Sequence, residues 1–259
     1  MYDTLMATRY YNPKYLQIFK WMFISNEDTN FTYDLTDKNN LELLKTIESC
    51  LNLPFEQLQK YLDEIQSDDQ LKIYLRKKIE DSDLKNFADR HVRFSRRVGW
   101  YIITRALKPK VLIETGVDKG LGSVVLCAAL LKNKEEGFPG RYYGTDINDK
   151  AGYLLDEKYK STGEIIYGDS ISSLQKFDKM IDIFINDSDH SASYEYLEYQ
   201  TIKKRLSPKA LILGDNSHVT DKLLKFSIEN DRNFVLFREE PKDHWYPGAG
   251  IGISFPKAK

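Results

Sequence analysis

The order of apolar and polar positions divides the chain into two parts. In the first part, residues 1–108, apolar residues recur at helical spacing, as in Leu44, Ile47 and Leu51, and strand signals are few. In the second part, residues 109–259, short apolar runs alternate with helical stretches. This pattern predicts an α-helical N-terminal region followed by an α/β domain.

Short apolar runs in the second part predict β-strands. They cover residues 111–114, 142–146, 164–167, 181–186, 210–214, 233–237 and 250–255. Helical stretches separate the first six runs, which predicts parallel strands joined by crossovers in a doubly wound, Rossmann-like seven-stranded sheet. Only a loop that contains Pro241 and Pro247 separates the last two runs. We therefore expect the last strand to insert antiparallel to its neighbour.

The first part ends in a segment that predicts one long helix, from Ser82 as the N-cap to a stop at Pro109. This helix would carry Arg93, Arg96 and Arg97. From the residues alone, these arginines can form a solvated basic face paired with nearby acidic residues.

A glycine-rich turn follows the first predicted strand and precedes a helix. Gly116, Gly120 and Gly122 allow a tight turn and a close approach of the backbone to a ligand. The N-terminus of the following helix, which includes Ser123, carries partial positive charge. A nucleotide-like cofactor fits these features, and an ordinary strand-to-helix turn is the alternative.

Acidic residues stand at the ends of the first three strands, where ligands of open α/β sheets bind. They are Glu114, Asp146 and Asp169. An acid at the position of Asp146 typically accepts hydrogen bonds from the hydroxyls of a ribose. Asp169, which precedes Ser170, could meet the edge of an adenine. The alternative is that such residues only cap the next helix.

Two further strand ends carry the candidate acceptor chemistry. Asp187 follows the fourth strand, and Asp215 and Asn216 follow the fifth, so that three oxygen ligands of the kind that Mg²⁺ prefers would meet there. Asp189 could replace Asp187, but it is better placed to cap the following helix. His190 could take up a proton near neutral pH. N-capping alone could also explain this group of residues.

The runs at residues 114–120, 145–146 and 168–170 resemble the first three motifs of class I S-adenosylmethionine (SAM)-dependent methyltransferases. The resemblance extends from about residue 90 to the C-terminus and implies SAM as the cofactor. It also implies that the helix with the three arginines lies over the cofactor or acceptor pocket, where an arginine could bind a carboxylate or a phosphate of the substrate; the solvated basic face stays open as the alternative. The cofactor contacts that it implies are Glu114, Gly116, Gly120, Ser123, Asp146, Asp169 and Ser170. A dinucleotide dehydrogenase competes on fold, but the glycines do not follow the spacing G-x-G-x-x-G.

The ends of the fourth and fifth strands resemble cation-dependent O-methyltransferases of the catechol and caffeoyl type. They resemble even more the sugar and macrolide O-methyltransferases with an Asp-x-x-His motif. This resemblance implies Asp187, Asp215 and Asn216 as metal ligands, and Asp187 and His190 as catalytic residues with His190 as the general base. The chain departs from the catechol type because it carries His190 where a lysine is usual, and because it has an additional Asn186.

We therefore expect SAM-dependent methyl transfer to a hydroxyl of a small molecule or a sugar, assisted by Mg²⁺. The alternatives are a metal-independent methyltransferase that uses His190 alone and a non-catalytic SAM-binding protein. Residues 1–108 would shape the acceptor site or form a dimer interface, so a homo-oligomer is compatible with the sequence. The loop at residues 239–250, with Trp245 and Tyr246, would close over the acceptor.

Composition narrows the partners. The chain has 38 Lys and Arg residues against 39 Asp and Glu residues, so no global field recruits nucleic acid or an anionic membrane. The sequence contains no apolar run long enough to span a bilayer, and its first residues lack the pattern of a secretory signal. We expect a cytoplasmic protein.

Overall fold

The computed structural model describes residues 2–25, 33–87 and 91–257. Its centre is a seven-stranded sheet in the order β3-β2-β1-β4-β5-β7-β6. The strands are β1 (Val111–Thr115), β2 (Arg141–Asp146), β3 (Gly163–Tyr167), β4 (Ile181–Asn186), β5 (Leu206–Gly214), β6 (Arg232–Arg238) and β7 (Gly250–Pro256). Strand β7 lies between β5 and β6 and is antiparallel to both, whereas the pairs among β1 to β5 are parallel. The predicted strands and the reversed last strand are confirmed.

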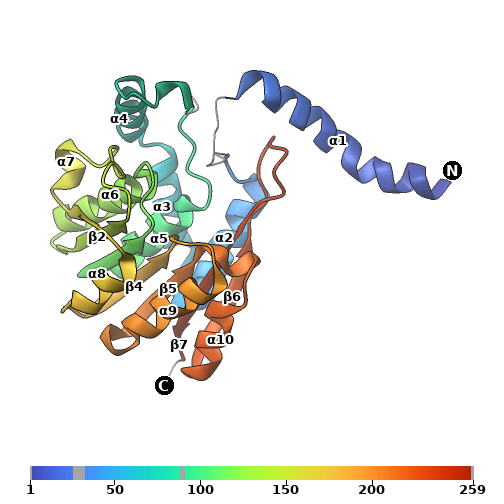
Figure 1. Ribbon diagram of the computed structural model, residues 1–259. Coiled ribbons are helices and arrows are strands. Elements are labelled where there is room, and N and C mark those ends of the chain that lie inside the picture. The colour runs from blue at the N-terminus through green and yellow to red at the C-terminus, as the bar shows by residue number, and fades with distance from the viewer. Residues whose placement is uncertain (1, 26–32, 88–90, 258–259) are drawn as a thin grey trace.

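Helices cover both faces of the sheet (Figure 1). The helices are α1 (Tyr2–Ile24), α2 (Asp37–Leu51), α3 (Phe55–Gln66), α4 (Asp69–Glu80), α5 (Arg97–Leu107), α6 (Leu121–Glu135), α7 (Glu157–Lys160), α8 (Ser170–Lys176), α9 (Ala192–Ile202) and α10 (Lys222–Glu229). Short 3₁₀ segments occupy Lys85–Phe87, Lys203–Arg205 and Asp215–His218.

The alternation of side chains along the strands gives each face of the sheet its own core. Leu112 of β1 packs in one cluster with Leu58 and Ile102 from α3 and α5, all of them fully buried. The next residue, Ile113, packs on the opposite face with Tyr199 of α9. Successive strand residues point to opposite faces, so a buried parallel strand reads as a continuous apolar run. The first face therefore joins side chains from the N-terminal helices and from the α/β part in one core.

The prediction of one long helix between Ser82 and Pro109 is wrong. Helix α5 begins only at Arg97, and the described residues before it, from residue 91, are irregular. Ser95 has a φ of 50°, in the left-handed region, where an α-helix cannot continue. Its backbone N–H and its hydroxyl both donate to the carbonyl oxygen of Tyr33, at 3.0 and 2.9 Å. A contact with a distant segment thus replaces the helical hydrogen bonds, and residues 88–90 lie outside the described part.

Helix α1 extends away from the rest of the molecule (Figure 1). Near its end, the ring of Trp21 contacts the ring of Trp245 in the β6–β7 connection, with centroids 5.3 Å apart. None of the described helices is long and apolar enough to cross a membrane. The roles predicted for the N-terminal region, as an acceptor cap or a dimer interface, stay predictions, as do the partners and the cytoplasmic location.

Candidate active site

A cavity of about 600 Å³ lies at the carboxyl ends of the parallel strands. Strands β2 and β4 leave β1 on opposite sides, so this is the point where the strand order reverses and where ligands of such sheets bind. The predicted site residues that line the cavity are Glu114, Gly116, Asp146, Asp169, Ser170, Asp187 and His190. The other predicted site residues do not line the cavity; they are Gly120, Ser123, Asp215 and Asn216.

The glycine turn after β1 lies against the backbone that follows β4. Gly116 has a φ of 81°, and a Cβ atom there would lie 2.0 Å from the carbonyl oxygen of Asp187. Gly120 has a φ of 95° and precedes the first residue of α6 without a side-chain cap. Both positions require glycine, because the conformation is left-handed and, at Gly116, another backbone is too close for any side chain.

Glu114 is buried at the wall of the cavity, where its carboxylate has two hydroxyl partners. Tyr142 and Ser123 both donate to its Oε2 atom, Ser123 at 3.2 Å. Burial raises the pKa of Glu114 to about 7, although these hydrogen bonds act in the opposite direction. Ser123, predicted as a cofactor contact, is itself fully buried and supports Glu114 from behind.

Backbone groups fix the carboxylate of Asp146. Its Oδ2 atom accepts hydrogen bonds from the backbone N–H groups of Val117 and Asp118, at 3.0 and 2.9 Å. Its Oδ1 atom accepts one from the N–H of Asn148, at 2.8 Å. The carboxylate is therefore held against the glycine turn, at the place in the fold predicted for a ribose contact.

Asp169 and Ser170 contact Tyr194, a cavity residue that sequence reasoning missed. Asp169 accepts a bond from the backbone N–H of Ser172 at 2.7 Å, so it caps α8. It also accepts a bond from the hydroxyl of Tyr194 at 2.6 Å, and both bonds hold the pKa of Asp169 below its ordinary value. The hydroxyl of Ser170 lies 2.9 Å from that of Tyr194. Nothing in the sequence around Tyr194 distinguishes it from the other tyrosines of α9.

Arg96 lies between the two carboxylates that were predicted to bind a metal. Its Nη2 atom is 3.3 Å from Oδ2 of Asp187, and its Nε atom pairs with Oδ1 of Asp215. Arg96 and Asp215 are buried, and Asp187 is largely buried, with 14% of its side chain exposed. Burial raises the pKa of Asp187 well above its ordinary value, and so does the neighbouring Asp215. Burial alone would lower the pKa of Arg96, but Asp215 and Asp187 raise it, so the arginine stays charged.

His190 pairs with Asn216. Its Nδ1 atom is 2.9 Å from Oδ1 of the amide. An amide oxygen only accepts hydrogen bonds, so in the neutral imidazole the proton is on Nδ1 and the lone pair is on Nε2. Asp189 accepts a bond from the N–H of Ser191 at 2.6 Å, but Ser191 is the N-cap of α9 and no side chain caps this helix, so the helix-capping role expected for Asp189 is wrong.

The predicted metal ligands do not fit a divalent cation as they are arranged. Asp187 and Asp215 form ion pairs with Arg96, and the side chain of Asn216 forms a hydrogen bond with His190. Within the described part of the chain, no group of three or more His, Cys, Asp or Glu residues could hold a metal ion. A hard cation requires several oxygen ligands directed at one point, and here a guanidinium occupies that point.

Arg97 is the first residue of α5, lines the cavity and is only 6% exposed. Its guanidinium lies 5.5 Å from the centre of the Trp100 ring. Its Nε atom has no hydrogen-bond partner among the residues that the structure describes. Burial and the adjacent Arg96 lower the pKa of Arg97. A buried cation at a cavity wall is costly without an anion beside it, so Arg97 is suited to bind an anionic ligand group.

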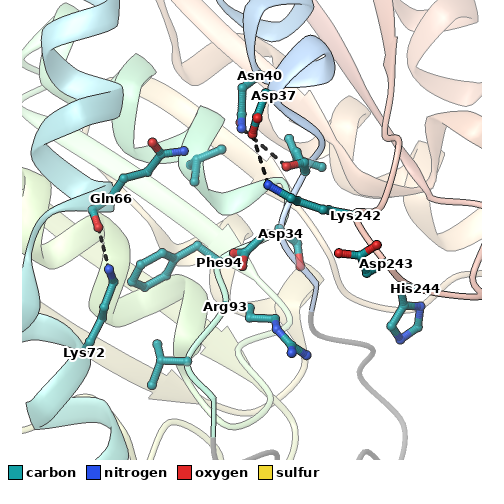
Figure 2. A pocket seen from close by; sticks show the side chains of 14 residues that line it. Asp34, Asp37, Asn40, Gln66, Lys72, Arg93, Phe94, Lys242, Asp243 and His244 are labelled. Atoms are coloured by element: carbon teal, nitrogen blue, oxygen red, sulfur yellow. Dashed lines mark hydrogen bonds and ion pairs between the residues drawn. The ribbon is translucent and has the colours of Figure 1, made fainter. Parts of the chain in front are cut away.

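A second cavity, of about 420 Å³, is lined in part by the segment before α5 (Figure 2). Phe94 and Ser95 line it, whereas Arg97 lines the first cavity. The second cavity contains an ion pair, in which Nζ of Lys242 is 3.3 Å from Oδ1 of Asp37 (Figure 2).

The loop predicted to close over the acceptor, at residues 239–250, is strapped to the segment before α2. Leu35 forms a bridge with Pro241, and the N–H of Thr36 donates to the carbonyl oxygen of Glu240 at 3.0 Å. Closure of this loop stays a prediction.

Comparisons with known proteins support a methyltransferase. Residues 113–217 match a family model described as a methyltransferase domain. A methyltransferase from Geobacter sulfurreducens has a similar structure, with a TM-score of 0.53 and 16% identity over 78% of this chain and 98% of that one. The SAH-bound methyltransferase PaMTH1 of Podospora anserina has a TM-score of 0.51 and 17% identity over 73% of this chain and 88% of that one. No curated protein matches this chain in sequence.

The fold is therefore the Rossmann-like methyltransferase fold. Together with the match at residues 113–217, it supports a class I SAM-dependent methyltransferase. The comparisons support neither a magnesium ion nor a particular acceptor.

Proposed function

We propose that this protein transfers the methyl group of SAM to a hydroxyl of a small molecule or a sugar. The observation that carries the proposal is one cavity at the switch point of the sheet that joins two kinds of groups. The glycine turn and Asp146 line one end, the cofactor end, and Asp187 and His190 line the other, the acceptor end. This is the arrangement that places a nucleoside beside a proton acceptor.

In this proposal Asp146 binds the ribose, and the amino-acid end of SAM lies toward Arg97 and Glu114. Arg97 pairs with the carboxylate of the methionine part, which gives this buried cation its anion. Glu114, ionised in the complex, pairs with the ammonium group. The methyl group then faces the acceptor end of the cavity.

His190 is the general base. The oxygen of the acceptor attacks the methyl carbon, a C–O bond forms, and the C–S bond breaks with its electron pair leaving on sulfur. The sulfur departs neutral, so no acid is required, and the hydroxyl proton passes to Nε2 of His190 and then to water. Asn216 keeps the base in the correct tautomer by accepting the Nδ1 proton. We favour the metal-independent form of this reaction over Mg²⁺ assistance, because Arg96 holds the two carboxylates.

Calorimetry with SAM and S-adenosylhomocysteine (SAH), followed by transfer from methyl-labelled SAM to a panel of sugars and phenols, tests the proposal. We expect both compounds to bind, and His190→Ala to lose transfer while it retains SAH binding. His218→Ala is the matched control, since His218 does not line the cavity. Binding of a nicotinamide dinucleotide in place of SAM and SAH would contradict the proposal.

A further inference from the structure

We infer that Arg96 is the resident cation of the acceptor end and takes the place between Asp187 and Asp215 that a divalent metal would take. The inference rests on the proposed function for its consequence in catalysis, but not for its geometry. It assigns Arg96 as a positioning residue, which acts through the carboxylates and not on the substrate.

The contacts of Arg96 are those expected of a bridging cation. One nitrogen lies beside each carboxylate: Nη2 donates a hydrogen bond to Asp187 at 3.3 Å, and Nε forms an ion pair with Asp215 without a hydrogen bond. The Trp100 ring lies 5.6 Å from the guanidinium carbon. Two carboxylates this close repel one another unless a cation lies between them. The planar guanidinium supplies that charge and excludes a metal from the same point.

The position of Arg96 is built into the backbone. Ser95, the residue before it, adopts a left-handed conformation that only surrounding contacts can maintain. Tyr33 provides these contacts, since its carbonyl oxygen accepts both the N–H and the hydroxyl of Ser95. The hydroxyl of Tyr33 in turn donates to Oε2 of Glu239 at 2.8 Å, beside the β6–β7 connection. Arg96 is therefore held from both sides and is not a surface arginine that happens to reach the site.

A guanidinium and a metal ion support different chemistry. A metal coordinates the acceptor hydroxyl and lowers its pKa, whereas an arginine has no coordination position to offer. With Arg96 in place, one of the two negative charges is compensated and both carboxylates are oriented, and removal of the hydroxyl proton falls to His190. Methyl transfer should then be insensitive to chelators.

Titration of the protein with Mn²⁺ tests the inference without any substrate. Electron paramagnetic resonance measures the concentration of free Mn²⁺ at each step of the titration. We expect the wild type to bind no Mn²⁺ at this site. Arg96→Ala should bind one Mn²⁺ with an affinity at least about tenfold above the detection limit of the titration, because it removes a buried positive charge from between the two carboxylates. The double variant Arg96→Ala/Asp215→Asn should lose that gain. Arg93→Ala is the matched control, since Arg93 lines the second cavity, and it should behave as the wild type.

Two results would overturn the inference: one Mn²⁺ bound by the wild type and lost in Asp215→Asn, or no gain in a folded Arg96→Ala. Should Arg96→Ala fail to fold, Arg96→Lys and the wild type still decide. Both should show the same melting temperature in EDTA and in excess Mg²⁺, and a rise in Mg²⁺ that Asp215→Asn abolishes counts against the inference. SAH calorimetry on the same samples tests the proposed function separately, so the failure of one is distinguishable from the failure of the other.

Discussion

The two ends of the cavity are held by partners at very different distances along the chain. At the cofactor end, Asp146 accepts backbone N–H groups that lie 29, 28 and 2 residues away in sequence. At the acceptor end, Asp187 pairs with Arg96, 91 residues away. The first end is thus assembled from adjacent strand-to-helix turns. The second depends on how the N-terminal segments fold back onto the sheet, so changes there should act through distant contacts.

The largest effect is expected at Gly116, where the cofactor end of the cavity contacts the backbone of the acceptor end. Gly116→Ala places a Cβ atom 2.0 Å from the Asp187 carbonyl oxygen and forces an alanine into a left-handed conformation. We expect the free energy of unfolding to fall by about 2 to 5 kcal/mol, measured by urea denaturation. Gly137→Ala is the control, because Gly137 has a φ of 88° but open space around it. It should cost only about 1 to 2 kcal/mol, and an equal loss in both variants would show that crowding at Gly116 is not important.

The cofactor end is tested alone by Asp146→Ala. The variant removes the proposed ribose contact and the acceptor of the N–H groups of Val117 and Asp118. We expect calorimetry to show SAH binding weakened by about a hundredfold, because hydrogen bonds to a charged group are among the stronger ones. Asp149→Ala, which changes an exposed acid in the loop after β2, should leave binding unchanged. Equal affinities for the two variants would remove Asp146 from the ribose site.

Sequence reasoning succeeded where the information is local. The apolar runs predicted each strand, and the glycines with Glu114 and Asp146 located the cavity, because each group lies on the turn that positions it. It failed at Arg96. The arginines were placed on a continuous helix because helical propensity accumulates along residues 82–107. The left-handed Ser95 that interrupts this helix depends on Tyr33, 62 residues away. A contact of that range leaves no pattern in a single sequence, so the partner of the two aspartates could not be predicted.

Arg97 sharpens the comparison, because it comes from the distant segment but faces the cofactor. In Arg97→Met the side chain keeps much of its length and loses its charge. We expect SAH to bind about tenfold to a hundredfold more weakly, the loss of a charged pair. Binding of 5′-methylthioadenosine, which lacks the amino-acid part, should not change. If both ligands weaken equally, Arg97 supports the pocket without binding the carboxylate.

The smallest effect concerns the protonation of Glu114. Its pKa of about 7 in the free protein means that this carboxyl group is largely protonated at pH 6. The ammonium group of the cofactor favours the ionised carboxylate, so binding must release the proton whenever the pH lies below that pKa. SAH affinity should therefore fall by up to about tenfold per pH unit below pH 7 and level off above it. Calorimetry in buffers of different ionisation enthalpy counts the released proton directly.

Glu114→Gln separates this effect from other titrations in the cavity. The amide keeps the shape of the side chain and can still accept from Tyr142, but it cannot change charge. The pH dependence between 6 and 8 should disappear, and the affinity at pH 8 should drop toward the value that the wild type shows at low pH. A variant that retains the slope would assign the proton to another group. The amino-acid end of the cofactor would then not lie at Glu114, and the cofactor end of the cavity would need a different orientation of SAM.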